Sequence, residues 1–134
     1  MTRVGLKGRS RSHRSKFWSL KGAYNGIPFE SGYEKRFLEQ CRQLGIKVER
    51  SKASVRYQDS TGKWHSYNPD FYWPDVDYVV EVKGTWAFRE NHGFVREKFA
   101  AAVAFFGGRY TIVTERELKT DFVIRLYRGL IDGN

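Results

Sequence analysis

Three charged side chains in the middle of the chain have the types and the spacing of a site for phosphate chemistry. Asp70 follows a proline and stands eleven residues before Glu81, and Lys83 stands two residues after Glu81. This spacing suits a hairpin that brings the two carboxylates together. Because hard divalent cations such as Mg²⁺ prefer carboxylate, carbonyl and water oxygens, the set could support metal-assisted hydrolysis of a phosphodiester.

The segment that carries Glu81 and Lys83 is predicted to be a β-strand. Residues 77–83 are rich in β-branched side chains, and their polarity partly alternates. Side chains alternate between the faces of a strand, so Glu81 and Lys83 share a face with Asp77 and Val79. Alone, an acid and a lysine at this spacing are most often a surface pair, and Pro-Asp is most often a turn. Their order and their place on a predicted strand pair favour catalysis.

A third carboxylate, Glu34, lies at the start of a predicted helix. Ser31 and Glu34 have the spacing of a capping box, and the helix is expected to run to Leu44, with Gly45 ending it. At 100° per residue, Glu34 is the only charge within the apolar arc of this helix. A buried carboxylate needs a partner, so Glu34 either pairs with a cation or caps its own helix through the Ser31 amide. The two roles are compatible.

The remaining segments predict the elements that must position these side chains. Residues 46–57 are interpreted as one long strand, and residues 64–73 as the strand that returns towards the central one. Residues 94–106 predict a helix that is apolar on most sides and therefore buried. Residues 109–114 predict a strand that lies parallel to the central one after a right-handed crossover. A helical tail is expected over residues 115–131.

The charge of the chain is concentrated near its N-terminus. The 134 residues suit a single domain, and the formal net charge is +9. Residues 1–29 carry seven cations and no acid, whereas the rest carries 17 cations and 15 acids. We interpret residues 1–26 as a basic arm and residues 27–134 as one domain. Such arms commonly bind nucleic acid, and a solvated tail without function is the alternative. The candidate DNA-binding residues are Arg3, Lys7, Arg9, Arg11, Arg14, Lys16 and Lys21.

Several classes of site and of location are disfavoured by composition. The lone Cys41 excludes an intramolecular disulfide and a cysteine-rich zinc site, and it fits a reducing compartment. The three histidines are scattered without a zinc-ligand spacing. No apolar run approaches the roughly 20 residues of a membrane span, and the basic N-terminus lacks an apolar signal segment. We expect a cytoplasmic protein that does not bind membranes.

Four segments together resemble a known nuclease family. They are residues 29–34, 44–49, 67–71 and 80–84. In this order they are similar to the PD-(D/E)xK nuclease superfamily and, within it, to the phage endonuclease I family of Holliday-junction resolvases. The Pro-Asp/Glu-x-Lys core alone is weakly specific, and the Ser-Gly-x-Glu and Gly-Ile-Lys segments make the set more specific. The resemblance spans residues 27–115. It fades in the longer basic arm and after Thr114.

The resemblance implies a fold, an activity and a set of roles. The fold is α/β with a restriction-endonuclease-like core, in the order αβββαβ, whose mixed central sheet is flanked by helices. Asp70 and Glu81 bind Mg²⁺, or Mn²⁺ as a substitute, with Glu34 near the metal, and Lys83 is catalytic. The carbonyl of Val82 and the carboxylate of Glu34 are candidate further ligands, and Glu34 is also a candidate catalytic residue. The implied function is a metal-dependent endonuclease acting on branched DNA in phage recombination. The alternatives are an endonuclease that nicks duplexes or cleaves transposon ends, and a catalytically idle DNA-binding module.

The same resemblance implies a homodimer. Two symmetric cuts in a four-way junction favour a two-fold arrangement of two active sites. We expect residues 46–67 to be exchanged between protomers, because the middle of this segment, residues 50–54, is polar and short of core-forming side chains. A β-hairpin within one chain is the alternative.

Overall fold

A computed structural model of the chain describes residues 20–133. The helices are α2 (Gly32–Gln43), α3 (Thr85–Arg89), the 3₁₀ turn η1 (His92–Phe94), α4 (Val95–Phe106), α5 (Glu115–Leu118) and α6 (Phe122–Asp132). The strands are β1 (Gly22–Tyr24), β2 (Ile27–Phe29), β3 (Glu49–Arg50), β4 (Val55–Gln58), β5 (Trp64–Tyr67), β6 (Phe71–Trp73), β7 (Tyr78–Val82) and β8 (Tyr110–Val113).

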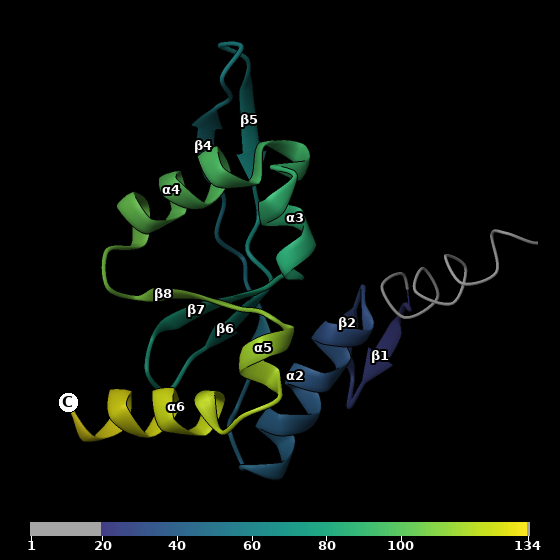
Figure 1. Cartoon of the computed structure of the whole chain (residues 1–134). Helices are drawn as coiled ribbons and strands as arrows, with labels where there is room; N and C mark the ends of the chain where they lie inside the picture. The colour runs from purple at the N-terminus through teal and green to yellow at the C-terminus, as the bar shows by residue number, and fades with distance from the viewer. Residues whose placement is uncertain (1–19, 134) are drawn as a thin grey trace, which may run out of the picture.

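The central sheet has the strand order β3-β6-β7-β8 and is mixed. Strands β3 and β7 run antiparallel to β6, whereas β8 runs parallel to β7, with Glu81 opposite Ile112. Helices α2, α5 and α6 lie on one side of this sheet, and α3, α4 and the β4–β5 hairpin lie on the other (Figure 1). This arrangement confirms the predicted α/β, restriction-endonuclease-like core and the parallel placement of the last strand.

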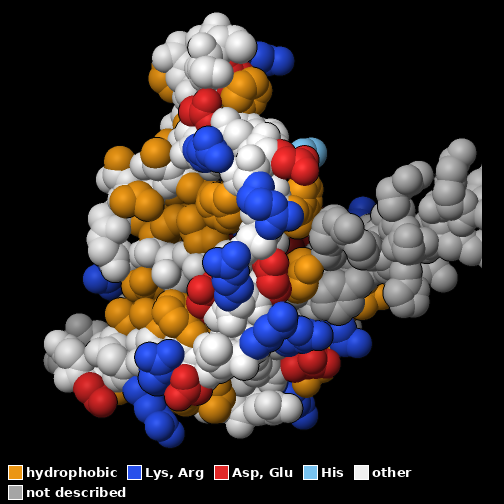
Figure 2. Space-filling view, viewed as in Figure 1, with side chains coloured by type: hydrophobic (Ala, Val, Ile, Leu, Met, Phe, Trp, Pro, Cys, Tyr) orange, Lys and Arg blue, Asp and Glu red, His pale blue; other side chains and the backbone are white. Residues whose placement is uncertain are grey.

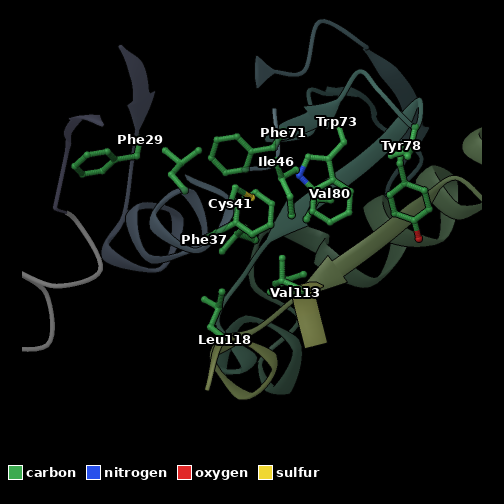
Figure 3. Packing of buried hydrophobic residues seen from close by; sticks show 14 residues of the cluster. Phe29, Phe37, Cys41, Ile46, Phe71, Trp73, Tyr78, Val80, Val113 and Leu118 are labelled. Carbon is green, nitrogen blue, oxygen red and sulfur yellow. The ribbon is translucent and has the colours of Figure 1, made fainter. Parts of the chain in front are cut away.

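Strand β7 is buried along its whole length because a hydrophobic core lies on each side of it. The alternation expected of a strand separates its residues: Tyr78, Val80 and Val82 belong to the core under α2. Val79 belongs to the core under α4. The first core is shown in Figure 3, where side chains of α2, β6, β7 and β8 pack together. It contains Phe37, Leu38, Cys41, Phe71, Trp73, Val80 and Val113.

Helix α2 begins and ends as its sequence predicts. The hydroxyl of Ser31 accepts a hydrogen bond from the Glu34 amide at 3.1 Å, which satisfies one of the free amides of the first turn. The helix ends at Gln43 with Leu44 as its C-cap, and Gly45 adopts a φ of +71°, a left-handed conformation that glycine tolerates well. Cys41 is buried, and this burial raises the pKa of its thiol to about 12.

The segment 46–57 is not the single long strand that the sequence predicts. Only Glu49–Arg50 pairs with β6, residues 51–54 have no regular structure, and Val55–Gln58 pairs with β5 in a separate two-stranded sheet. The reason is tertiary. The two ends of the segment pack into different hydrophobic cores, and the polar residues between them pack into neither core. The pairing of Val55 with Tyr67 makes β4 and β5 a hairpin within one chain.

Helix α4 is also less buried than predicted. Its inner face carries Val95, Phe99 and Ala102, but Val103 and Phe105 are 54% and 63% exposed. The helix covers the second core from outside and has the sheet and hairpin on one side only, so hydrophobic side chains appear on the surface over α4 (Figure 2). Apolar composition predicted the helix, but it did not predict how many faces would find a neighbour.

The two ends of the described chain contain regular structure. Residues 115–131, predicted as a helical tail, form α5 and most of α6. Strands β1 and β2 form a hairpin whose turn residues, Asn25 and Gly26, both have positive φ. Asn-Gly is a strong hairpin signal, so this hairpin was readable in the sequence. Folded structure therefore reaches back to Gly22, inside the segment assigned to the arm. Within residues 20–133, no helix combines the length and the hydropathy that a bilayer span requires.

Candidate active site

Asp70 and Glu81 meet at the end of the β6–β7 pair. Phe71 is opposite Val80, so Asp70, just before β6, comes level with Glu81. The amide of Asp70 donates to Oε1 of Glu81 at 3.1 Å, and the amide of Val82 donates to Oδ2 of Asp70 at 2.9 Å. The two carboxylates therefore lie together, as the spacing of eleven residues predicts, and two main-chain amides fix them.

The carboxylate of Glu81 lies in an environment that resists its ionisation. Its side chain is buried, and burial raises the pKa of Glu81 to about 7. A 2.5 Å hydrogen bond from the Tyr67 hydroxyl and the positive charges of Lys98 and Lys83 oppose this shift. Burial and the charge of Glu81 raise the pKa of Tyr67, so its phenol stays protonated and donates. The Tyr110 hydroxyl lies 2.9 Å from that of Tyr67.

The carboxylate of Asp70 is largely removed from water, with 13% of its side chain exposed. Burial raises the pKa of Asp70 well above its usual range, and the negative charges of Glu81 and Glu34 raise it further. Oδ1 of Asp70 lies 3.8 Å from Nη2 of Arg50. Two carboxylates that oppose each other's ionisation form a site that a positive ion would stabilise.

Glu34 is joined to this pair through an arginine. Its Oε1 accepts from Nη1 of Arg50 at 2.9 Å and from the amide of Glu30 at 3.1 Å. The capping bond predicted to the Ser31 amide is thus made to Glu30, because the carboxylate turns toward Arg50 on β3. Glu34 combines the two roles that the sequence left open: it satisfies an amide at its helix N-terminus, and it pairs with a cation.

The donors at this site fit a hard divalent cation at the pair Asp70 and Glu81. Both provide carboxylate oxygens, which Mg²⁺ and Mn²⁺ prefer, and their mutual repulsion is relieved by a cation. In the described part of the chain, residues 20–133, no three or more His, Cys, Asp or Glu side chains group so that they could hold a metal ion. The candidate ligands are therefore two carboxylates and the nearby carbonyl of Val82, and Glu34 acts through Arg50.

Two lysines place positive charge beside the carboxylates. Lys83 directly follows β7, and its amide donates to the Val113 carbonyl at 2.9 Å, which fixes its backbone to β8. Lys98 comes from α4, and its Nζ lies 5.1 Å from the ring centroid of Tyr67. Burial and the charge of Lys83 lower the pKa of Lys98. The site therefore contains both signs of charge at close range.

The family of this chain follows from a match to a family model. The model of phage endonuclease I matches residues 15–105, which is more than half of the chain. The chain belongs to the phage endonuclease I family. It is therefore an endonuclease, and DNA is its substrate. The match contains Glu34, Asp70, Glu81 and Lys83 and ends within α4, so β8, α5 and α6 lie beyond it. Comparisons with curated proteins and with solved structures found no match.

Four residues of the endonuclease's site were not singled out from its sequence: Arg50, Tyr67, Lys98 and Tyr110. Lys98 directly precedes Phe99 and borders the buried stripe of α4, so helical periodicity could have found it. Tyr67 begins the motif that contains Asp70. Arg50 and Tyr110 gave no local signal, because their positions depend on how β3 and β8 pair with the central strands.

The predicted DNA-binding residues of the arm are only partly described. Lys21 is exposed just before β1. The other six candidates, Arg3, Lys7, Arg9, Arg11, Arg14 and Lys16, lie outside the described residues.

Proposed function

We propose that this endonuclease hydrolyses phosphodiester bonds in branched DNA and that it requires a divalent metal ion. The observation that carries the metal requirement is the pair Asp70 and Glu81, two largely buried carboxylates with raised pKa values and bonds to neighbouring amides. Buried groups with perturbed pKa values are characteristic of functional sites. The phage endonuclease I family supports an endonuclease, and the preference for branched DNA is our extension.

Asp70 and Glu81 would hold Mg²⁺, or Mn²⁺ as a substitute, with the Val82 carbonyl as a further donor. When bound, the ion supplies positive charge that polarises the scissile phosphate. The protein's own contribution is orientation. Tyr67 fixes Oε1 of Glu81, and the Val82 amide fixes Oδ2 of Asp70, so neither carboxylate needs to reorganise during the reaction.

The positive side chains complete the proposed mechanism. Lys83 orients the attacking water or offsets the negative charge that develops on the phosphate oxygens. Lys98 adds a second positive charge from helix α4, which lies on the other side of the sheet from α2. Arg50 ties Glu34 to Asp70 and so keeps a third carboxylate in place without committing it to the metal. We assign Arg50 and Glu34 as positioning residues.

A cleavage assay on matched DNA tests the proposed function. The wild-type chain is incubated with a four-way junction, and separately with a linear duplex of the same arm sequence, in Mg²⁺ or in EDTA. We expect cleavage of the junction in Mg²⁺, none in EDTA, and slower cleavage of the duplex. Equal rates on both substrates would favour a duplex-nicking enzyme. Binding without cleavage in Mg²⁺ and Mn²⁺ would favour an idle DNA-binding module.

Substitution of Lys83 tests its catalytic role. Lys83→Ala should inactivate the enzyme without loss of metal binding, whereas Lys52→Ala, in the exposed connection between β3 and β4, should remain active. A normal turnover rate of Lys83→Ala would make Lys83 a structural residue.

We also propose that the endonuclease acts as a homodimer, because one active site cannot cut two symmetric strands in one bound state. Light scattering of the full chain should give twice the monomer mass. Mixed dimers of wild-type and Asp70→Ala chains should then nick a junction once rather than cut it on both sides. Paired cutting by a monomer would contradict this proposal.

A further inference from the structure

The hairpin formed by β4 and β5 has two faces of different character. In its register Val55 is opposite Tyr67, and these two residues and Tyr57 are buried in the core under α4. The alternate positions form the outer face, and all of them are exposed: Arg56, Gln58, Trp64 and Ser66. The tip of the hairpin projects beyond α3 and α4 (Figure 1).

A large aromatic side chain lies on this outer face. Trp64 is 55% exposed, although tryptophan usually buries most of its area. Cζ of Arg56 lies 5.0 Å from the centroid of the Trp64 ring, within the range of a cation–π contact. An indole with an arginine against it is the combination that binds nucleobases by stacking and phosphates by charge.

The exposed charges of the hairpin are positive. Asp59 is the only acid between Val55 and Tyr67, and it is buried. Arg56 and Lys63 are exposed. The outer face and the tip therefore complement the phosphate backbone of DNA.

The tip of the hairpin is fixed by internal hydrogen bonds. The carboxylate of Asp59 accepts from the Thr61 amide at 2.8 Å and from the Lys63 amide at 3.1 Å, and it lies 2.6 Å from Nε2 of His65. Gln58 donates from Nε2 to the Gly62 carbonyl at 2.8 Å. Trp64 therefore projects from a preorganised element, which lowers the entropy lost on binding.

We propose that the outer face of the β4–β5 hairpin binds the branch point of the DNA, with Trp64 stacked on a base that has lost its stacking partner there. Arg56 and Lys63 contact the adjacent phosphates. This inference deepens the proposed function and rests on its branched substrate. Trp64 is six residues from Asp70, so about 20 Å of chain at most separates them. At 3.4 Å per nucleotide, the stacked base lies within about six nucleotides of the cut.

Binding measurements on two substrates test this proposal. A fluorescent four-way junction and the matched linear duplex are titrated with the full chain in EDTA, which prevents cleavage. Trp64→Ala should bind the junction roughly 5- to 150-fold more weakly and the duplex within about twofold of wild type. Trp64→Phe should restore most of the junction affinity, because it keeps a ring. Ile131→Ala, which removes another exposed apolar side chain from α6, is the matched control and should change neither affinity.

A fluorescent base analogue locates the contact. With 2-aminopurine placed at successive positions around the branch point, the wild-type chain should quench one position within about six nucleotides of the cut, and Trp64→Ala should not. Unchanged junction affinity of Trp64→Ala, or an equal loss on junction and duplex, would overturn the proposal. Failure here is separable from failure of the proposed function, since junction cleavage by the wild-type chain is measured independently.

Discussion

At the residue scale, the candidate site holds two acidic groups where ionisation is unfavourable. Burial raises the pKa values of both Asp70 and Glu81, and the neighbouring negative charges raise that of Asp70 further. Tyr67, Lys98 and Lys83 offset only part of the shift at Glu81. The folded protein without metal is therefore strained by its own charges at neutral pH. This strain is the physical reason to expect a cation between the carboxylates of Asp70 and Glu81.

Removing the charge of Glu81 should stabilise the metal-free protein at high pH. Between pH 4.5 and about 7, the folded state keeps a proton on Glu81 that the unfolded chain has lost. Stability therefore falls as pH rises through this window and stays low above it. Glu81→Gln should raise the free energy of unfolding at pH 8 in EDTA by about 3 kcal/mol at most, with little effect at pH 4.5. Urea unfolding of both chains at the two pH values measures this difference in the free energy of unfolding.

Glu115 provides a control, because its pKa is shifted in the opposite direction to that of Glu81. Burial opposes its ionisation, but hydrogen bonds from Thr85 hold the pKa of Glu115 below its usual value. Its contribution is present above the unfolded pKa and is lost as pH falls through the folded pKa. Glu115→Gln should therefore destabilise the protein at pH 8. If Glu81→Gln destabilised the protein at pH 8 as Glu115→Gln does, the charge strain assigned to Glu81 would be contradicted.

Tyr67 should control how well Glu81 binds metal. Its hydrogen bond favours the ionised form of Glu81, so Tyr67→Phe should raise the pKa of Glu81 further. At pH 7 the Mg²⁺ concentration for half-maximal cleavage should then rise roughly tenfold. Tyr110→Phe removes only the contact between the two hydroxyls and should have a smaller effect. An equal effect of the two variants would show that the contact between the two hydroxyls, and not the bond from Tyr67 to Glu81, controls metal binding.

At the element scale, what the sequence predicted correctly is what local patterns determine. The apolar arc of α2, its Ser31 cap and the alternation along β7 depend on nearby residues, and each was predicted. The division of residues 46–57 between two sheets depends on partners far along the chain, and it was missed. For the same reason Asp70 and Glu81 could be paired from a hairpin spacing, whereas the contact of Arg50 with Glu34 could not be foreseen.

The cap of α2 is expected to contribute to stability and to the site. Ser31→Ala leaves the Glu34 amide without its side-chain acceptor and should lower the free energy of unfolding by about 1 kcal/mol. Ser31→Asp, which can accept the same bond, should retain most of it. Urea denaturation of the three chains tests this, and equal stability of Ser31→Ala and wild type would show that solvent replaces the cap.

At the scale of the whole molecule, the site joins parts of the chain that belong to different cores. Glu34 comes from the helix of the first core, and Lys98 comes from the helix of the second. Asp70 and Glu81 lie at the central sheet, which separates the two cores. The site is therefore complete only when both sides of the sheet are folded.

The basic arm should govern how strongly DNA binding depends on salt. Deleting residues 1–19 removes six cations and keeps β1 and Lys21. If about three of the six contact phosphates, the slope of log affinity against log salt should flatten by roughly 3. Junction binding at several salt concentrations measures the slope of each chain. An unchanged slope would make the arm a passive tail.

The most direct test of the metal site is the rate of junction cleavage as a function of Mg²⁺ for the wild-type and Asp70→Asn chains. The wild-type rate should rise with Mg²⁺ to a plateau. Asp70→Asn should cleave at least a hundredfold more slowly at every concentration, because a lost ligand removes several kcal/mol of transition-state stabilisation. It should still bind the junction as well as wild type or better, since it has one negative charge fewer near the phosphate. Full Mg²⁺-dependent cleavage by Asp70→Asn would contradict the assignment of Asp70 and Glu81 as the metal site.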